Sequence, residues 1–123
     1  MESTFLAGKL DGISLDHLEA LFEGLQAGMR ALEGAYNQPR MSGDAGEDAR
    51  ELLEGEMERL SDMSDEVAVE AEKRVPKSRD DADRRARLLI RWGLICGEPW
   101  SGIAQLAITA LEAQRQPQEA VDA

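Results

Sequence analysis

Four acidic residues have the type and spacing that could hold a divalent cation. Glu51 and Glu54 are three residues apart in a segment with helical periodicity, which places their carboxylates one turn apart on one face. Asp80 and Asp83 repeat this spacing about one helix later. Carboxylate oxygens are the ligands that a hard cation such as magnesium prefers. The alternative interpretation is that these acids belong to a solvated acidic helix face.

In outline, Glu51-Leu-Leu-Glu54 and Asp80-Asp-Ala-Asp83 resemble the paired acidic motifs of the all-α nucleotide pyrophosphohydrolases, the family that includes MazG-type enzymes. The resemblance covers only these residues, and the second motif departs from the Glu-x-x-Asp usual in that family. It implies a magnesium-dependent hydrolase of nucleoside triphosphates, in which arginines of the same region would contact phosphates.

The single histidine and the single cysteine add no further catalytic machinery. His17 is expected on the surface of the first helix. A small acidic helical protein with an exposed histidine resembles the histidine phosphotransfer domains. The residues after His17 lack the basic residue and the glycine that follow the histidine in those domains. Cys96 ends an apolar segment and is expected to be buried and inert. Since no base or triad is evident, the sequence favours a protein that is not an enzyme.

Charge makes nucleic acid an unfavourable partner, because the formal net charge of the chain is −11. The exception is a run of arginines from Arg79 to Arg91, which leaves a DNA-binding regulator as a further, less favoured alternative. The next predicted helix, Ile103 to Glu112, contains no lysine or arginine and would be a poor recognition helix. We therefore expect the arginines to face the acidic helix predicted between Glu47 and Glu72, within the fold or across an oligomer.

Hydrophobic residues make up 42% of the 123-residue chain, enough to pack one core. We expect a flexible segment at 1–13, a single helical domain at 14–114 and a disordered tail at 115–123. One cysteine cannot form an internal disulfide, and the sequence has neither a signal-peptide pattern nor an apolar run long enough to cross a bilayer. A cytoplasmic protein without a cofactor is predicted.

Apolar periodicity predicts two long helices at the start of the domain. The first begins after the N-cap Ser14, and the second runs from after Asp44 to about Arg74. Both carry apolar residues at alternating spacings of three and four, as in a heptad seam. On the first helix these are Leu15, Leu18, Phe22, Leu25, Met29, Leu32 and Tyr36, and on the second Ala49, Leu53, Met57, Leu60, Met63, Val67 and Ala71.

Two shorter helices are predicted to follow. The third begins after the N-cap Ser78, and its second half, Leu88 to Cys96, is apolar almost all round, which predicts burial on several sides. The fourth spans Ile103 to Glu112. The predicted fold is thus all-α: an antiparallel four-helix bundle or two stacked helical hairpins, with two long helices followed by two short ones.

Two short helices cannot cover the whole length of two long seams, and an uncovered apolar seam favours a partner. The main hypothesis is a helical protein–protein interaction module, such as an adaptor, regulator or assembly component. Its partner would be another protein or a second copy, a dimer above all, and acids between Glu47 and Glu72 would attract a basic partner. The candidate contacts, which could equally form the protein's own core, are Leu18, Phe22, Leu25, Met29, Leu32, Met57 and Met63.

Overall fold

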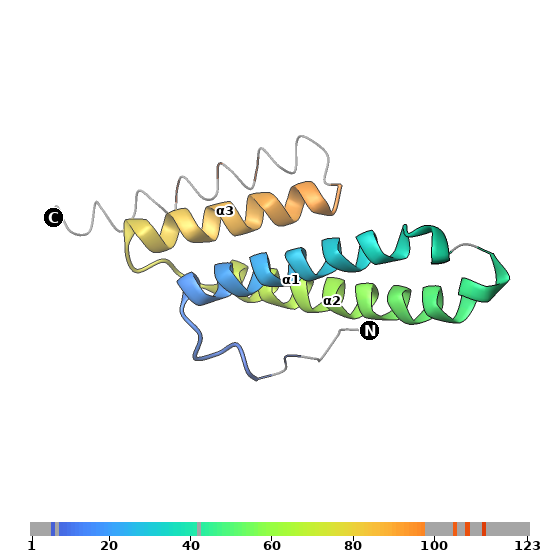
Figure 1. The fold of residues 1–123 in the computed structure, drawn as a ribbon. Helices are drawn as coiled ribbons and strands as arrows, with labels where there is room; N and C mark the ends of the chain where they lie inside the picture. The colour runs from blue at the N-terminus through green and yellow to red at the C-terminus, as the bar shows by residue number, and fades with distance from the viewer. Residues whose placement is uncertain are drawn as a thin grey trace, which may run out of the picture.

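The computed structural model describes residue 6, residues 8–41 and 43–97, and the single positions 105, 108 and 112. Helices α1 and α2 form a long antiparallel hairpin, and α3 lies along one end of it (Figure 1). Within these ranges the chain contains no strand, which confirms the all-α prediction. The helical elements are α1 (Leu15–Tyr36), the short 3-10 helices η1 (Pro39–Met41) and η2 (Asp44–Gly46), α2 (Glu47–Lys73) and α3 (Arg79–Ile95).

The described residues form three α-helices where the sequence predicted four, so a four-helix bundle is not confirmed. The predicted fourth helix, Ile103 to Glu112, lies outside the described residues except for Gln105, Ile108 and Glu112, which are exposed. The predicted tail, 115–123, lies wholly outside them.

The helix boundaries follow from local sequence signals. Ser14 and Ser78 act as the predicted N-caps: their hydroxyl oxygens accept hydrogen bonds from the backbone N–H of His17 at 3.2 Å and of Asp81 at 3.1 Å. Helix α2 begins at Glu47, directly after η2, and its N-cap Gly46 offers no side-chain hydrogen bond. At Gly46 a side chain would collide with the Met41 carbonyl, so the connection between α1 and α2 requires glycine there.

The core lies at the end of the hairpin where all three helices meet. Phe22 and Val67 are fully buried, and Leu10, from the segment before α1, also packs there. The buried core residues from the helices come from residues 15–25 of α1, 67–71 of α2 and 82–89 of α3. We call this part, residues 15–26 and 63–73 together with α3, the three-helix base.

Helix α3 is less deeply buried than its sequence suggested. Leu88 and Leu89 are in the core, whereas Leu94 and Ile95 are 54% and 50% exposed. Cys96 is exposed as well, so the prediction that it is buried is wrong. The reason is that α3 packs on the hairpin through one stripe, and residues on its other sides do not reach the core.

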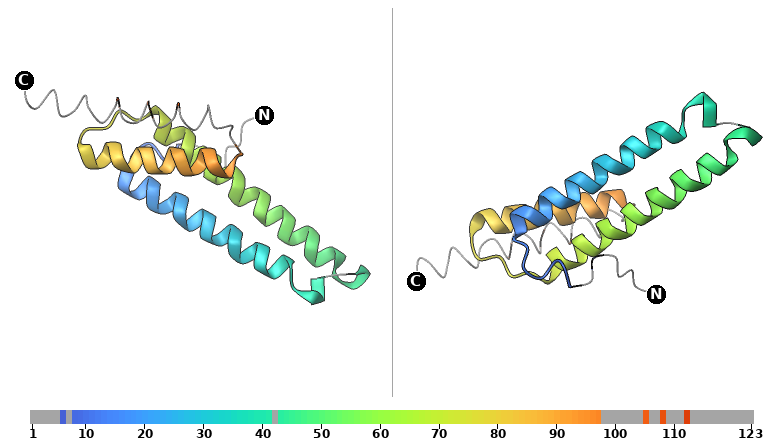
Figure 2. Two further views of the ribbon diagram at one scale, coloured as in Figure 1. Left: turned by 90° about the horizontal axis from the view of Figure 1, so that it is seen from above. Right: turned by 60° about the horizontal axis from the view of Figure 1, so that its bottom comes forward.

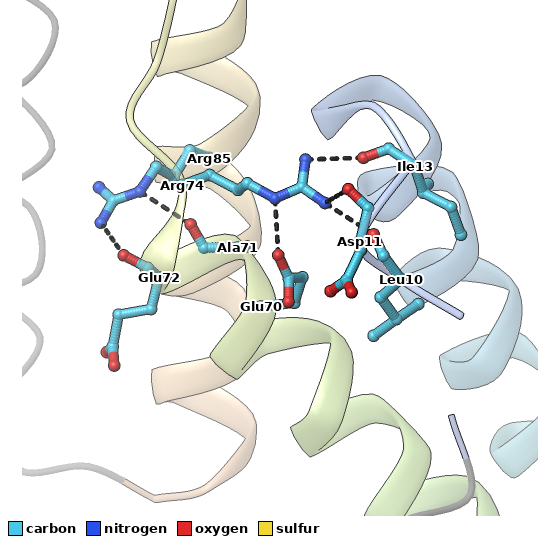
Figure 3. Close-up of polar contacts among 8 residues, drawn as sticks. All are labelled: Leu10, Asp11, Ile13, Glu70, Ala71, Glu72, Arg74 and Arg85. Atoms are coloured by element: carbon cyan, nitrogen blue, oxygen red, sulfur yellow. Dashed lines mark hydrogen bonds and ion pairs between the residues drawn. The ribbon is translucent and has the colours of Figure 1, made fainter. Parts of the chain in front are cut away.

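Arg74 fastens the segment before α1 to the end of α2 (Figure 3). Its guanidinium donates hydrogen bonds to the carbonyl oxygens of Leu10 and Ile13, both at 2.7 Å, and to the carboxylate of Glu70 at 2.6 Å. Part of the segment that we predicted to be flexible, 1–13, therefore contributes both core and backbone contacts.

Arg85 caps the C-terminus of α2 from α3 (Figure 3). It is 8% exposed and donates hydrogen bonds to the carbonyl oxygens of Ala71 at 2.9 Å and Glu72 at 2.8 Å. The last carbonyls of a helix lack hydrogen-bond donors within the helix, and Arg85 supplies donors for two of them. Burial lowers the pKa of Arg85, which nevertheless stays charged at neutral pH.

Candidate functional site

Arginines of α3 pair with acids of α1, and not with the acidic α2 as we predicted. The partners in each pair are 68 residues apart in the chain, so α1 and α3 run parallel in one constant register. The pairs are Arg84 Nε to Asp16 Oδ1 at 3.4 Å, Arg87 Nε to Glu19 Oε2 at 2.8 Å and Arg91 Nη1 to Glu23 Oε1 at 3.1 Å.

We call these three ion pairs the α1–α3 ladder. Its middle pair, Arg87 with Glu19, is the most buried. Glu19 is only 8% exposed, and Arg87 holds its carboxylate with two hydrogen bonds, at 2.8 and 3.1 Å. The hydrogen bond to Glu19 raises the pKa of Arg87. Acids of α1 thus engage three of the arginines on α3, Arg84, Arg87 and Arg91.

The four carboxylates of the hypothetical magnesium site lie at opposite ends of α2. Glu51 and Glu54 stand near the start of α2, whereas Asp80 and Asp83 follow its end, in the first turns of α3 (Figure 1). About 20 helical residues separate the two pairs, which is about 30 Å. The Glu54 carboxylate accepts a hydrogen bond from the Tyr36 hydroxyl at 2.8 Å. In the part of the chain that the structure describes, no three His, Cys, Asp or Glu residues are grouped to hold a metal.

The seven predicted contact residues separate into two groups. Leu18, Phe22 and Leu25 are buried in the core of the chain itself, and Met63 is half-buried against that core. These four help to hold the three helices together. Met29, Leu32 and Met57 are half-buried and lie further along the hairpin. His17 is exposed, as predicted.

The hairpin extends well past α3, and we call this extension the distal hairpin: residues 29–36 of α1, 47–62 of α2 and the connection between them. Arg91, one turn before the end of α3, stands opposite Glu23, so α3 ends before Met29 is reached. Figures 1 and 2 show the two helices continuing alone beyond it. Among the described elements, no third helix covers this part.

Apolar residues line the facing sides of the two distal helices, and all of them are half-buried. We call this set the distal seam; its members are Met29, Leu32, Leu53, Met57 and Leu60. The helices approach closely at Gly28, where a side chain would come within 3.2 Å of Leu60. The other two glycines of α1, Gly24 and Gly34, show no such neighbour within 4 Å.

A buried polar pair marks the boundary between base and distal hairpin. Gln26 Nε2 donates a hydrogen bond to Ser64 Oγ at 3.2 Å, and the two residues are 7% and 2% exposed. A polar pair inside an otherwise apolar helix interface favours one register of the two helices over others. Gln26 lies outside the heptad seam, so apolar periodicity does not predict this pair.

Carboxylates form a stripe along α2, at spacings of three and four residues. Its last member, Asp65, accepts a hydrogen bond from Trp92 Nε1 on α3 at 2.8 Å. The others continue from there along the distal hairpin, beyond the end of α3. The acidic stripe consists of Glu47, Glu51, Glu54, Glu58, Asp62 and Asp65.

Comparison with protein-family models, curated proteins and solved structures finds no match for this chain. Among the described residues, no helix is long and apolar enough to cross a bilayer.

Proposed function

We propose that the protein is a helical protein–protein interaction module that binds its partner through the distal hairpin. One observation carries the proposal: the heptad seam continues past the end of α3 with half-buried leucines and methionines that no described helix covers. A helix laid onto such a seam would bury these side chains, as in helix-in-groove recognition. Flexible methionines such as Met29 and Met57 adapt to differently shaped partners.

The proposed contact set differs from the one that the sequence suggested. Leu18, Phe22 and Leu25 act as internal support, because they are buried beneath α2 and α3. Met29, Leu32 and Met57 remain candidate contacts, and Leu53 and Leu60 join them as the other members of the distal seam.

A separate protein and a second copy of the chain are the two candidate partners. Homodimerisation would bring two acidic distal hairpins together, which like charges oppose at low salt. We therefore place a basic partner first and a dimer second. The protein would serve as an adaptor, regulator or assembly component rather than as an enzyme.

We also propose a cytoplasmic location and a fourth helix over 103–112, as the sequence indicates. The sequence contains a single cysteine, Cys96, and therefore no internal disulfide, which is typical of proteins in a reducing compartment. The apolar residues of 103–112 recur at spacings of three and four, which supports a helix that packs on the rest of the domain.

Site-specific photo-crosslinking in the cells that produce the protein tests the proposed binding surface. A photo-reactive amino acid replaces Met57, and we expect one discrete adduct, whose mass and peptides distinguish a heterologous protein from a second copy. Leu52 provides the matched control, because it lies on the same stretch of α2 but is 74% exposed and outside the seam.

The same adduct at both positions, or none at Met57, would contradict the proposal. A defined adduct at Met57 alone would support it. If that adduct is a dimer of the chain, self-association takes the place of the heterologous partner.

A further inference from the structure

We infer that the distal hairpin binds a basic amphipathic helix, which continues the path of α3 and sets its basic side chains along the acidic stripe. The inference rests on the proposed function and adds to it the chemistry of the partner. It follows from how α3 itself covers the same two helices, from the position of the stripe, and from the charges left in the rest of the chain.

Helix α3 shows what kind of helix the α1–α2 hairpin accepts. It places apolar residues such as Leu88 and Leu89 against the hairpin. Arg87 and its neighbours in the ladder pair with acids on the α1 side, while Trp92 donates to Asp65 on the α2 side. One half of the hairpin is therefore already covered by an amphipathic helix with a basic edge, which is α3.

The acidic edge changes helices where α3 ends. Beyond Glu23, the α1 edge carries only one further acid, Glu33, together with the basic Arg30. On α2, by contrast, the acidic stripe begins beside Trp92 and runs on for about 27 Å, at 1.5 Å per residue. Spacings of three and four residues keep these carboxylates on one side of the helix. A helix that continues the path of α3 would therefore meet its acidic partners on α2.

Most members of the stripe are not neutralised by the protein. The side chains of Glu47, Glu51, Glu58 and Asp62 form no ion pair with any described residue. The two arginines of α2 have other partners. Arg59 pairs with Glu56, and Arg50 donates hydrogen bonds to the carbonyls of the η1–η2 connection. A row of carboxylates beside an apolar seam attracts cationic residues at matching intervals.

Among the 123 residues given, the arginine-rich segment is α3, which is engaged with α1. After Gly97 the sequence contains a single basic residue, Arg115, and before Ser14 it contains a single one, Lys9. A second copy has the same shortage. Charge complementarity thus favours a different, basic polypeptide.

Binding of synthetic helices to the full-length protein tests this inference. Three fluorescent peptides of about 20 residues, long enough to span the distal hairpin, share one leucine heptad face and differ only at one flanking edge, which carries lysine, glutamine or glutamate. We expect the lysine peptide to bind about tenfold more tightly than the glutamine peptide, and the glutamate peptide to bind most weakly. The preference for lysine should diminish as salt is raised.

Matched charge variants locate the effect. The stripe variant Glu51→Gln/Glu58→Gln/Asp62→Asn should reduce lysine-peptide affinity about tenfold. The control variant Asp44→Asn/Asp48→Asn/Glu56→Gln removes as many negative charges from the same hairpin but leaves the stripe intact, and should change affinity less than about threefold. Helicity by circular dichroism confirms that both variants fold. The reversal Glu51→Lys/Glu58→Lys should transfer the preference to the glutamate peptide.

The outcomes separate this inference from the proposed function. Equal binding of lysine and glutamine peptides, abolished by Met57→Glu, would overturn the basic helix but leave the seam as a binding surface. Equal losses in the stripe and control variants would show that net charge rather than the stripe attracts the peptide, and would also overturn it. Binding that Met57→Glu leaves unchanged would contradict the proposed function as well.

Discussion

The three-helix base and the distal hairpin are built from the same heptad pattern on α1 and α2, yet they bury it to different depths. In the base, Leu18 and Phe22 are fully buried because α3 lies across the hairpin. In the distal hairpin, Met29 and Leu32 occupy equivalent positions and are only half-buried. The comparison teaches that a heptad seam identifies residues that face another helix, whereas burial depends on how many helices meet there.

The three-helix base and the distal hairpin also differ in their polar contacts. The base contains the α1–α3 ladder, the buried Arg85 cap and the Arg74 contacts. The distal hairpin contains fewer buried polar contacts, and the hydrogen bond between Tyr36 on α1 and Glu54 on α2 is exposed. We therefore expect the base to supply most of the free energy of unfolding and the distal hairpin to supply the binding surface.

Truncating one apolar residue in each region should give the largest contrast. Phe22→Ala should lower the free energy of unfolding by about 3–5 kcal/mol, because it leaves a cavity among the buried residues of all three helices. Leu32→Ala should cost about 1 kcal/mol, because a half-buried side chain loses less contact area. Urea unfolding followed by circular dichroism measures both, and equal costs would mean that the distal hairpin is packed as tightly as the base.

Within the base, the α1–α3 ladder should give a smaller and graded effect. Arg87→Ala should cost about 1–2 kcal/mol, because it leaves the buried carboxylate of Glu19 without its bidentate partner. Arg91→Ala should cost about 0.2–0.5 kcal/mol, since its pair with Glu23 is exposed. The same unfolding experiment compares them, with Arg79→Ala as an exposed arginine control. A larger loss for Arg91→Ala would contradict the burial argument.

These contrasts show how much the sequence could predict. The serine caps and the three helix spans were predictable because they depend on neighbouring residues. The ladder was visible as matching spacings of acids near Glu19 and arginines near Arg87, but pairing them requires knowing that α1 and α3 are adjacent and parallel. The prediction that Cys96 is buried was wrong for the same reason, because an apolar segment does not reveal which of its sides the fold covers.

The candidate site was predictable only in part. Periodicity identified Met29, Leu32 and Met57 as interhelical residues, and composition identified the acidity of α2. Neither could show where α3 ends, and that end separates internal support from exposed seam. The proposed magnesium ligands shared a local spacing, but their separation along α2 is a property of the whole fold.

The smallest effect concerns the single tyrosine, at the far end of the distal hairpin. The hydrogen bond from Tyr36 to Glu54, and then the charge of Glu54, raise the pKa of the Tyr36 hydroxyl. Folding thus favours protonated tyrosine: this contribution is complete below the unfolded pKa of about 10 and is lost as pH rises through the higher folded pKa. Titration of phenolate absorbance should give a midpoint above 10, and Glu54→Ala should move it down towards that value. An unchanged midpoint in Glu54→Ala would mean that the contact does not persist in solution.

Hydrogen–deuterium exchange of the full chain, alone and with the lysine-edged peptide, tests the division between base and distal hairpin most directly. The account predicts slow exchange for amides at residues 18–26 and 64–71 in the free protein, faster exchange at 30–36 and 50–60, and peptide-induced protection confined to the second set. Uniform exchange along both helices of the free protein, or protection that appears in the base, would contradict it.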